Sequence, residues 1–171
     1  MKVIGLPRVV SLAVFCLFAL SCEKNAVFED AKPEKAAASL KSADTPFNLE
    51  VILRSDGKGF GHVKFRQDVD VAKIITLDVW VRDLEPNHKY LLQRAVDARD
   101  GNCTSTSWLT LGKGLTPQAI LTDDKGKATE SLWRSVTAIP TGSEFDIHFR
   151  VVDAATLNVI LDSDCYSYVV R

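Results

Sequence analysis

Residues 75–82, with the sequence ITLDVWVR, show the clearest pattern in this chain of 171 residues. Isoleucine, leucine and two valines occupy every second position, and Thr76, Asp78, Trp80 and Arg82 stand between them. Because successive side chains of a β-strand point to opposite faces, this alternation predicts a strand with one face on a hydrophobic core. The other face is expected to carry the polar residues and Trp80.

The same period of two recurs on both sides of this segment. Residues 47–54 alternate in this way toward the N-terminus, and residues 145–151 do so toward the C-terminus. Turn sequences rich in glycine, proline, asparagine or aspartate separate such segments, as at 56–59, 84–87 and 123–126. Further strands are expected over residues 60–67, 88–96, 108–111, 119–122, 128–135, 159–161 and 165–170.

The spacing of these segments predicts an all-β fold. No segment has a helical period of useful length, and no motif repeats at a fixed interval, so propellers and solenoids are not supported. The intervals between turns suit an antiparallel sandwich or barrel, and we predict an antiparallel β-sandwich of about eight strands over residues 46–171.

The N-terminal segment has the organisation of an export signal. Residues 9–20 are apolar except for Ser11, and Lys2 and Arg8 precede them. A membrane-spanning helix needs about 20 apolar residues, whereas a secretory signal needs only about 7 to 15 after a basic start. The segment is therefore too short to span a bilayer and has the length of a cleavable signal.

The apolar run ends in Ala19-Leu20-Ser21-Cys22, which resembles the lipobox of bacterial lipoproteins. Ala19 stands where that family usually has leucine. In the family the cysteine is lipidated and becomes the new N-terminus, so the resemblance implies a lipoprotein signal peptide over residues 1–22 and a lipid anchor on Cys22. An ordinary signal peptide that is cut nearby, with Cys22 incidental, is the alternative.

Residues 23–45 are rich in alanine, lysine and glutamate and hold few large apolar residues. Such a segment buries too little surface to offset the entropy of ordering, so we predict a flexible tether between the lipid and the domain. The expected location is the bacterial cell envelope, with the lipid in the outer membrane and the domain on its periplasmic or surface side.

The charge of the chain is nearly balanced. It carries 21 lysine and arginine residues and 22 aspartate and glutamate residues, a formal net charge of −1. No run of lysine or arginine stands out. Because phosphate binding needs a concentrated basic face, a nucleic-acid partner is not expected.

The four cysteines fall into two groups. Cys16 is removed with the predicted signal and Cys22 is the predicted lipid site, which leaves Cys103 and Cys165 in an exported domain. Two cysteines in an oxidising compartment usually pair, so we predict a disulfide that ties residues 97–107 to the last strand. Free thiols, or half of a metal site, are the alternatives.

Residue patterns of common catalytic and metal sites do not occur in the sequence. His62, His88 and His148 are far apart, and no His-x-His pair exists. There is no Gly-x-Ser-x-Gly motif and no glycine-rich loop that enters a helix. The aspartates at 123–124 and 162–164 are expected to hydrogen-bond their own turns, and a calcium site there is the less favoured alternative. We therefore predict no metal, no cofactor and no enzymatic activity.

A second resemblance rests on Leu84-Glu85-Pro86-Asn87-His88-Lys89-Tyr90, on the loop cysteine Cys103 and on the late cysteine Cys165. Together they are similar to copper/zinc superoxide dismutase, which implies a Greek-key sandwich with a bridge from a loop to the last strand. An immunoglobulin-like sandwich is the alternative. Where that family has a His-x-His metal pair, this chain has Leu91-Leu92-Gln93-Arg94, and residues 102–114 lack the ligands of its zinc loop. The resemblance therefore implies the scaffold and argues against the activity.

These observations predict a non-catalytic, lipid-anchored β-sandwich that presents a binding or structural surface. The expected partners are the membrane, through the N-terminal lipid, and an envelope protein or a carbohydrate. A superoxide-dismutase-like metal-binding protein or enzyme is the alternative function.

A loop tied by a disulfide loses little entropy on binding, which favours Arg99, Asn102, Trp108 and Trp80 as contact residues. The simpler interpretation, which we favour, is that the loop only closes the end of the sandwich and that the tryptophans are tucked under loops or into the second sheet. The sequence does not indicate which face of its strand carries Trp133. His148 shares its side of the predicted strand with polar residues, which indicates a solvated face.

Overall fold

The computed structural model describes residues 45–171. The predicted signal peptide, the lipid site at Cys22 and residues 23–44 of the predicted tether lie outside this range and stay predictions. In the part that is described, no helix is long and apolar enough to cross a membrane.

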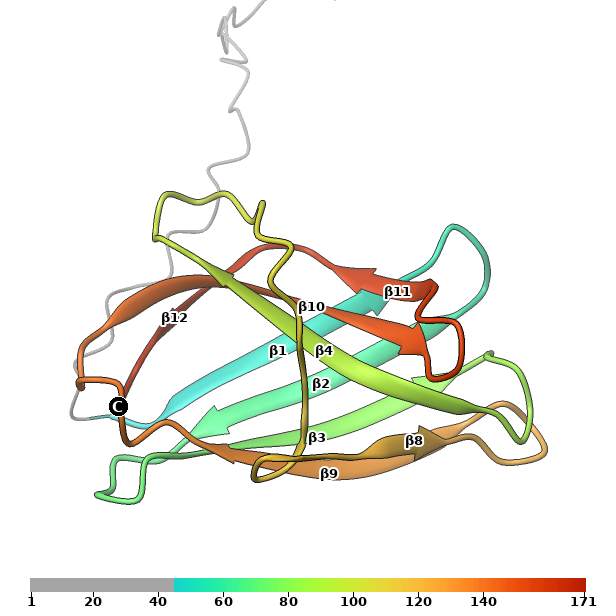
Figure 1. Ribbon diagram of the computed structural model, residues 1–171, viewed down its shortest axis with the longest axis horizontal. Coiled ribbons are helices and arrows are strands. Elements are labelled where there is room, and N and C mark those ends of the chain that lie inside the picture. The colour runs from blue at the N-terminus through green and yellow to red at the C-terminus, as the bar shows by residue number, and fades with distance from the viewer. Residues whose placement is uncertain (1–44) are drawn as a thin grey trace, which may run out of the picture. The chain divides into compact units, whose positions relative to one another are not determined.

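All regular secondary structure over residues 45–171 is β-strand (Figure 1). Eight strands have four residues or more: β1 (Phe47–Arg54), β2 (Phe60–Gln67), β3 (Ile74–Arg82), β4 (Lys89–Asp97), β9 (Ala128–Ser135), β10 (Glu144–Asp153), β11 (Val159–Ser163) and β12 (Tyr166–Val169). The other four have only two or three residues: β5 (Leu109–Thr110), β6 (Gly112–Lys113), β7 (Thr116–Pro117) and β8 (Ala119–Leu121). The prediction of an all-β fold is confirmed, whereas the predicted number of about eight strands is too low.

The strands form one hydrogen-bonded sheet rather than the two separate sheets of the predicted sandwich. Its order is β5-β4-β10-β11-β1-β2-β3-β9-β6-β7, with β12 paired to β10 and β8 paired to β4. The pairing of β6 with β9 is parallel, so the sheet is mixed and not wholly antiparallel as predicted. A change of register between Val151 and Val152 lies within the pairing of β10 with β11. Bulges of this kind bend a strand, and the sheet curls until it is nearly closed into a barrel (Figure 1).

The seam of this curled sheet lies between β4 and β9. Residues 109–113 run across it, because β5 pairs with β4 and β6 pairs with β9 (Figure 1). At the other end of the seam, β8 pairs with β4. Short strands therefore bridge the two long edge strands. The predicted strands at 108–111 and 119–122 contain β5 and β8, whereas the sequence pattern misses β6 and β7.

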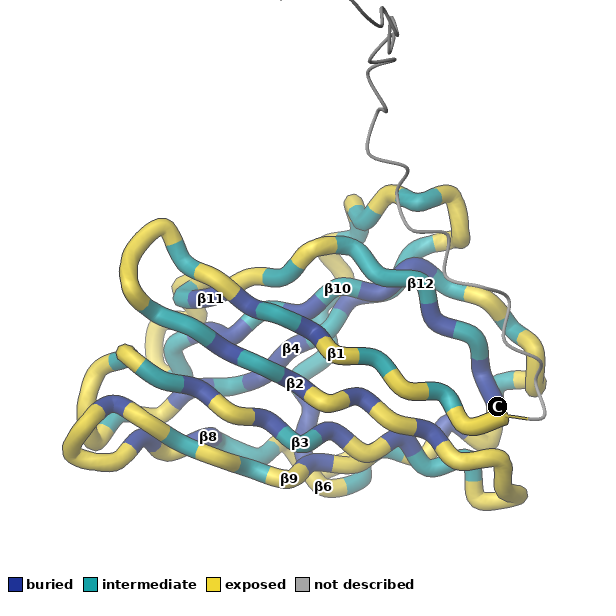
Figure 2. The backbone as a smooth tube through the Cα atoms, turned by 180° about the vertical axis from the view of Figure 1, so that it is seen from behind, coloured by how far each residue is buried: buried dark blue, intermediate teal, exposed yellow. Residues whose placement is uncertain are grey.

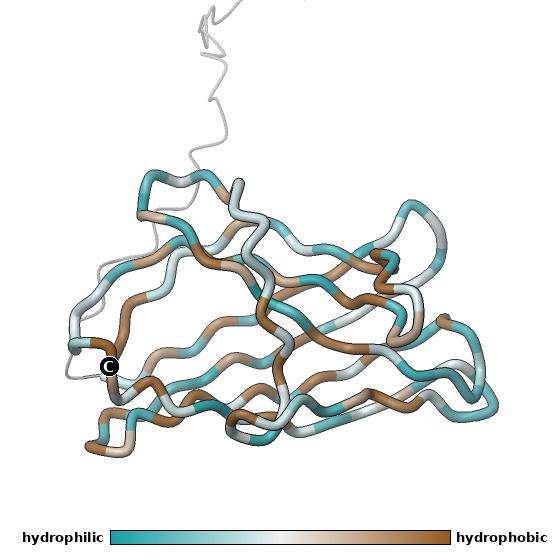
Figure 3. The backbone as a smooth tube through the Cα atoms, viewed as in Figure 1, coloured by the Kyte–Doolittle hydropathy of each residue, from teal (hydrophilic) through white to brown (hydrophobic). Residues whose placement is uncertain are grey.

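The core lies on the inner face of the curled sheet. In β3 the residues predicted to face inward, Ile75, Leu77, Val79 and Val81, are at most 7% exposed (Figure 2). The same alternation of apolar and polar residues is visible along the long strands in Figure 3. Phe65 packs edge-on against Phe47, Phe149 and Tyr168, with ring centroids 5.0 to 6.0 Å apart.

Two turns at one end of the domain pack on each other. Asn87 has a φ of 53°, the left-handed conformation expected in the turn at 84–87, and its N–H donates to the carbonyl of Asp123 (3.0 Å). Gly126 has a φ of 69°, and a Cβ atom there would lie 2.0 Å from the carbonyl oxygen of Leu84. Glycine is therefore required at 126 by its conformation and by the close approach of the neighbouring turn.

Candidate functional site

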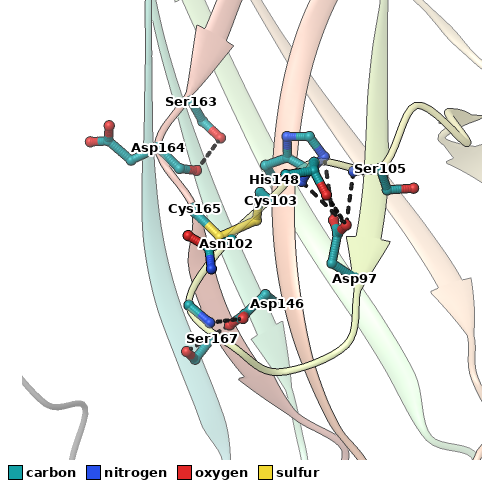
Figure 4. Close-up of a disulfide and its surroundings, with 12 residues drawn as sticks. Asp97, Asn102, Cys103, Ser105, Asp146, His148, Ser163, Asp164, Cys165 and Ser167 are labelled. Carbon is teal, nitrogen blue, oxygen red and sulfur yellow. Dashed lines mark hydrogen bonds and ion pairs between the residues drawn. A yellow bond between two sulfur atoms is a disulfide. The ribbon is translucent and has the colours of Figure 1, made fainter.

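Cys103 and Cys165 form a disulfide, as the cysteine count predicts, with Cα atoms 5.5 Å apart (Figure 4). The bond ties the loop that follows β4 to the residue just before β12. Residues 97–108 lie on one end of the domain and are anchored to the last strand of the sheet.

The loop is also held by two aspartates. Asp97 Oδ1 accepts hydrogen bonds from the N–H groups of Thr104 (3.2 Å) and Ser105 (2.8 Å). Asp146 of β10 accepts from the N–H groups of Asp100 (2.8 Å) and Gly101 (2.5 Å) (Figure 4). The hydrogen-bonding capacity of the loop is therefore largely used within the domain.

Asp146 is 1% exposed and ionised. Burial opposes its charge, but hydrogen bonds from Gly101, Ser167 and Asp100, in that order, outweigh burial and hold its pKa below the usual range. Its other oxygen accepts from the Ser167 hydroxyl at 3.0 Å. This carboxylate stabilises the folded loop, and no part of the arrangement resembles a general acid or base.

A cluster of possible metal ligands lies under the same loop. Donor atoms of Asp97, Cys103 and His148 are within 4.8 Å of one another. The Cys103 sulfur is bonded to Cys165, so it is not available as a thiolate ligand. Asp97 Oδ2 and His148 Nε2, 3.9 Å apart, remain, and two ligands are too few for a zinc site.

The predicted solvated face around His148 is wrong. The side chain is 15% exposed and its ring lies 4.6 Å from the ring of Trp108, at a tilt of 44°. The guanidinium carbon of Arg150 lies over the Trp108 ring, 3.9 Å from the ring centroid. These contacts cover Trp108, which is half-buried, so the simpler interpretation holds for this tryptophan.

Arg99 and Asn102 also make contacts within the domain. Arg99 forms an ion pair with Glu144 at the start of β10. The N–H of Asn102 donates to Asp100 Oδ1 (2.8 Å). The structure thus places Arg99, Asn102 and Trp108 in one segment, and each of them is engaged by neighbouring residues.

Trp80 lies elsewhere, on the outer face of β3, whereas Arg99, Asn102 and Trp108 lie in the loop that follows β4. It is 36% exposed and packs edge-on against Phe60 of β2, with ring centroids 5.8 Å apart. The Arg82 guanidinium lies 5.0 Å from the Phe60 ring and 5.8 Å from the Trp80 ring. Trp80 and the three loop residues therefore do not form one contact surface.

Trp133 shares this outer face. It is 42% exposed, and in the register of β3 with β9 it lies opposite Thr76, whereas Trp80 lies opposite Thr129. The two tryptophans are thus four residues apart along paired strands, roughly 14 Å at about 3.4 Å per residue. The interpretation that each tryptophan is tucked away is wrong for Trp80 and Trp133.

A shallow groove with a polar floor lies beside Trp80 on the paired strands β2, β3 and β9. Its lining residues are His62, Lys64, Asp78, Val79, Trp80, Thr129, Glu130 and Ser131. We define the outer aromatic face as this groove together with Phe60, Arg82 and Trp133. Sequence reasoning missed Phe60 and Arg82 because their proximity depends on the register of β2 with β3, where they lie opposite each other.

Other titratable groups form hydrogen bonds and ion pairs that hold neighbouring segments together. Asp123 accepts hydrogen bonds from the N–H groups of Lys127 and Lys125, which lower its pKa, so it shapes its own turn as expected. Asp153 accepts from the N–H of Thr156 and is paired with His88, and these interactions hold its pKa far below the usual value. His62 is paired with Glu50. The three histidines lie apart from one another in separate pairs.

No protein family, no curated protein and no solved structure matches the chain. Its function must therefore be inferred from its own residues and their arrangement.

Proposed function

We propose that the chain is a non-catalytic, lipid-anchored binding protein of the bacterial cell envelope, and that it binds a carbohydrate through the outer aromatic face. The observation that carries the proposal is the polar groove lined by the exposed Trp80, together with a second exposed tryptophan, Trp133, on the same outer face of the sheet. Indole rings offer flat apolar surfaces at low entropic cost, and tryptophan is enriched at contact surfaces.

The groove beside Trp80 suits the hydroxyl groups of a sugar. Asp78 and Ser131 lie in its floor and are exposed, and the Ser131 hydroxyl donates to Asp78 Oδ1 (3.0 Å). Lys64 and Thr129 add a cation and a second hydroxyl. Polar groups that orient a ligand between apolar walls are the usual composition of a small-ligand site.

The proposed ligand is tested by calorimetric titration of the full chain with soluble fragments of envelope polysaccharide. We expect the variants Trp80→Ala and Trp133→Ala to lose at least tenfold in affinity, because each removes one stacking surface. Trp108→Phe is the matched control, since it alters a tryptophan outside the outer aromatic face. Equal affinity in wild type and both alanine variants would exclude this face as the site.

The lipid anchor rests on the apolar run of residues 9–20 that ends at Cys22. More than one acyl chain holds a protein firmly in a membrane, so the wild type should partition almost completely into the detergent phase. Cys22→Ala should move the protein to the aqueous phase or block its processing. A wild type that stays aqueous with an unmodified Cys22 would exclude the anchor.

For the scaffold we propose a Greek-key order of strands, of the superoxide-dismutase type, within the nearly closed sheet. Support comes from β11, which returns after a long connection to lie beside β1 of the β1-β2-β3 hairpins, and from the bridge between a loop and the last strand. The alternative function, a metal-binding protein or enzyme of that type, is tested by metal analysis of the purified chain. Stoichiometric copper or zinc would favour it over carbohydrate binding.

A further inference from the structure

The inner face of the curled sheet holds a cavity of about 100 Å³ near the seam. Most of its walls are core side chains, among them Phe65, Leu77 and Phe149, which are at most 2% exposed. Two lining residues do not fit this apolar surrounding, namely Arg94 of β4 and Arg134 of β9.

Both arginines occupy inward-facing positions of their strands. Arg94 lies on the same face of β4 as Tyr90 and Leu92, because side chains alternate between the two faces of a strand. Tyr90 and Leu92 are fully or almost fully buried. Arg134 follows Leu132 in the same way, and Leu132 is 2% exposed. Their guanidinium groups therefore come from the two long strands that flank the seam and face a common cavity.

Within residues 45–171 neither arginine side chain has an ion pair or a hydrogen bond with a protein group. Burial and, after it, the positive charge of Arg134 lower the pKa of Arg94. Two like charges beside an apolar wall destabilise the fold unless an anion lies between them.

Inward-pointing charges can also protect an exposed sheet edge from pairing with other chains. That explanation fits poorly here, because β5 and β8 already pair with β4, and β6 already pairs with β9. The edges beside the two arginines are thus covered by the chain itself. The remaining explanation for the two converging guanidinium groups is that they bind a negatively charged ligand.

We propose that this cavity binds a small apolar carboxylate, with its hydrocarbon part between the sheet walls and its carboxylate between Arg94 and Arg134. Guanidinium groups match the two oxygens of a carboxylate in a planar, bidentate geometry. A cavity of about 150 Å³ lined by aliphatic and aromatic residues accepts benzene. The cavity of this chain is somewhat smaller, so the ligand has a short or branched hydrocarbon part.

This site is separate from the outer aromatic face, and its test does not depend on carbohydrate binding. Because detergent would compete for an apolar cavity, the full chain is prepared with Cys22→Ser. It is titrated by calorimetry with butanoate, hexanoate and octanoate, and with hexanol as the uncharged control. We expect one of the carboxylates to bind best and hexanol to bind at least tenfold more weakly than hexanoate.

The variants Arg94→Met and Arg134→Met keep much of the apolar stem and remove the charge. Each should lower carboxylate affinity at least tenfold, whereas Arg54→Met, an exposed arginine at the end of β1, should leave it unchanged. Without ligand, Arg94→Met should melt at or above the temperature of the wild type, which shows that the variant folds. The proposal is overturned if no carboxylate binds, if hexanol binds as well as hexanoate, or if both methionine variants bind like the wild type.

Discussion

The loop at residues 97–108 and the outer aromatic face differ in how their side chains are used. In the sequence the loop has the features of a binding site, but Trp108 is half-buried against Arg150 and His148. Arg99 and Asn102 are exposed and interact with Glu144 and Asp100. The outer face looks like an ordinary solvated strand surface, yet Trp80 and Trp133 are 36% and 42% exposed. The comparison teaches that a long polar loop can be packed against its own domain, and that a regular strand can leave large aromatic side chains exposed.

The largest effect on stability is expected from the disulfide. Replacing both Cys103 and Cys165 by serine releases a loop closed over 62 residues, which the chain-entropy estimate values at about 4 kcal/mol. Chemical denaturation should therefore show a large loss in the free energy of unfolding. At temperatures where the double variant is folded, its affinity for carbohydrate should equal that of the wild type. A loss of affinity there would place the contact surface in the loop.

Asp146→Asn is expected to cost about 2 kcal/mol, because hydrogen bonds to a buried charge are replaced by weaker ones. Since its pKa is held below the usual value in the folded state, the ionised carboxylate stabilises the fold above the unfolded pKa of about 3.9. This contribution is lost as the pH falls through the folded pKa. Unfolding curves measured from pH 7 down to pH 2 should thus converge for wild type and variant, and a constant difference would contradict the assignment.

Trp108→Ala should destabilise the domain by about 1 to 2 kcal/mol, because it removes the contacts with Arg150 and His148. Thermal melting is the measurement, and Trp108→Phe should recover part of the loss. A variant that melts at the wild-type temperature would show that the ring does not stabilise the domain and is available to bind a partner.

The smallest effect on stability is expected from Trp80→Ala. Trp80 touches Phe60 and Arg82 on an exposed strand surface, so the free energy of unfolding should change by about 0.5 kcal/mol or less. A drop of several degrees in the melting temperature would show that Trp80 is a packing residue and would weaken its role in binding.

The long strands could be predicted because their core residues repeat every second position, as in β1, β3 and β10. Short strands were also expected at 108–111 and 119–122, where β5 and β8 form. The strands β6 and β7 could not be predicted, because two residues carry no period and the pairing of β6 depends on the distant strand β9. The face of β9 that carries Trp133 could not be predicted, because the charged residue Glu130 lies on the inward face. There it pairs with Lys113 of β6 (3.0 Å). Only the folded chain brings that lysine to it.

The cavity left a signal in the sequence that is visible in retrospect. Arg94 interrupts the inward series formed by Tyr90, Leu92 and Val96, and a charge in an apolar series indicates either an error of register or a site. What the sequence could not supply is the position of β4 opposite β9, which brings Arg134 to the same cavity. Pairing between strands that are far apart in the chain is decided by the whole fold.

The chain contains three tryptophans, and their indole N–H signals report on the two regions at once. The most direct measurement is a nitrogen–proton correlation spectrum of the labelled chain during titration with envelope polysaccharide fragments. The account predicts that the signals of Trp80 and Trp133 shift together and saturate at the same ligand concentration, while the signal of Trp108 stays in place. A shift confined to Trp108, with Trp80 and Trp133 unchanged, would contradict the account and show that the ligand binds at the disulfide-tied loop.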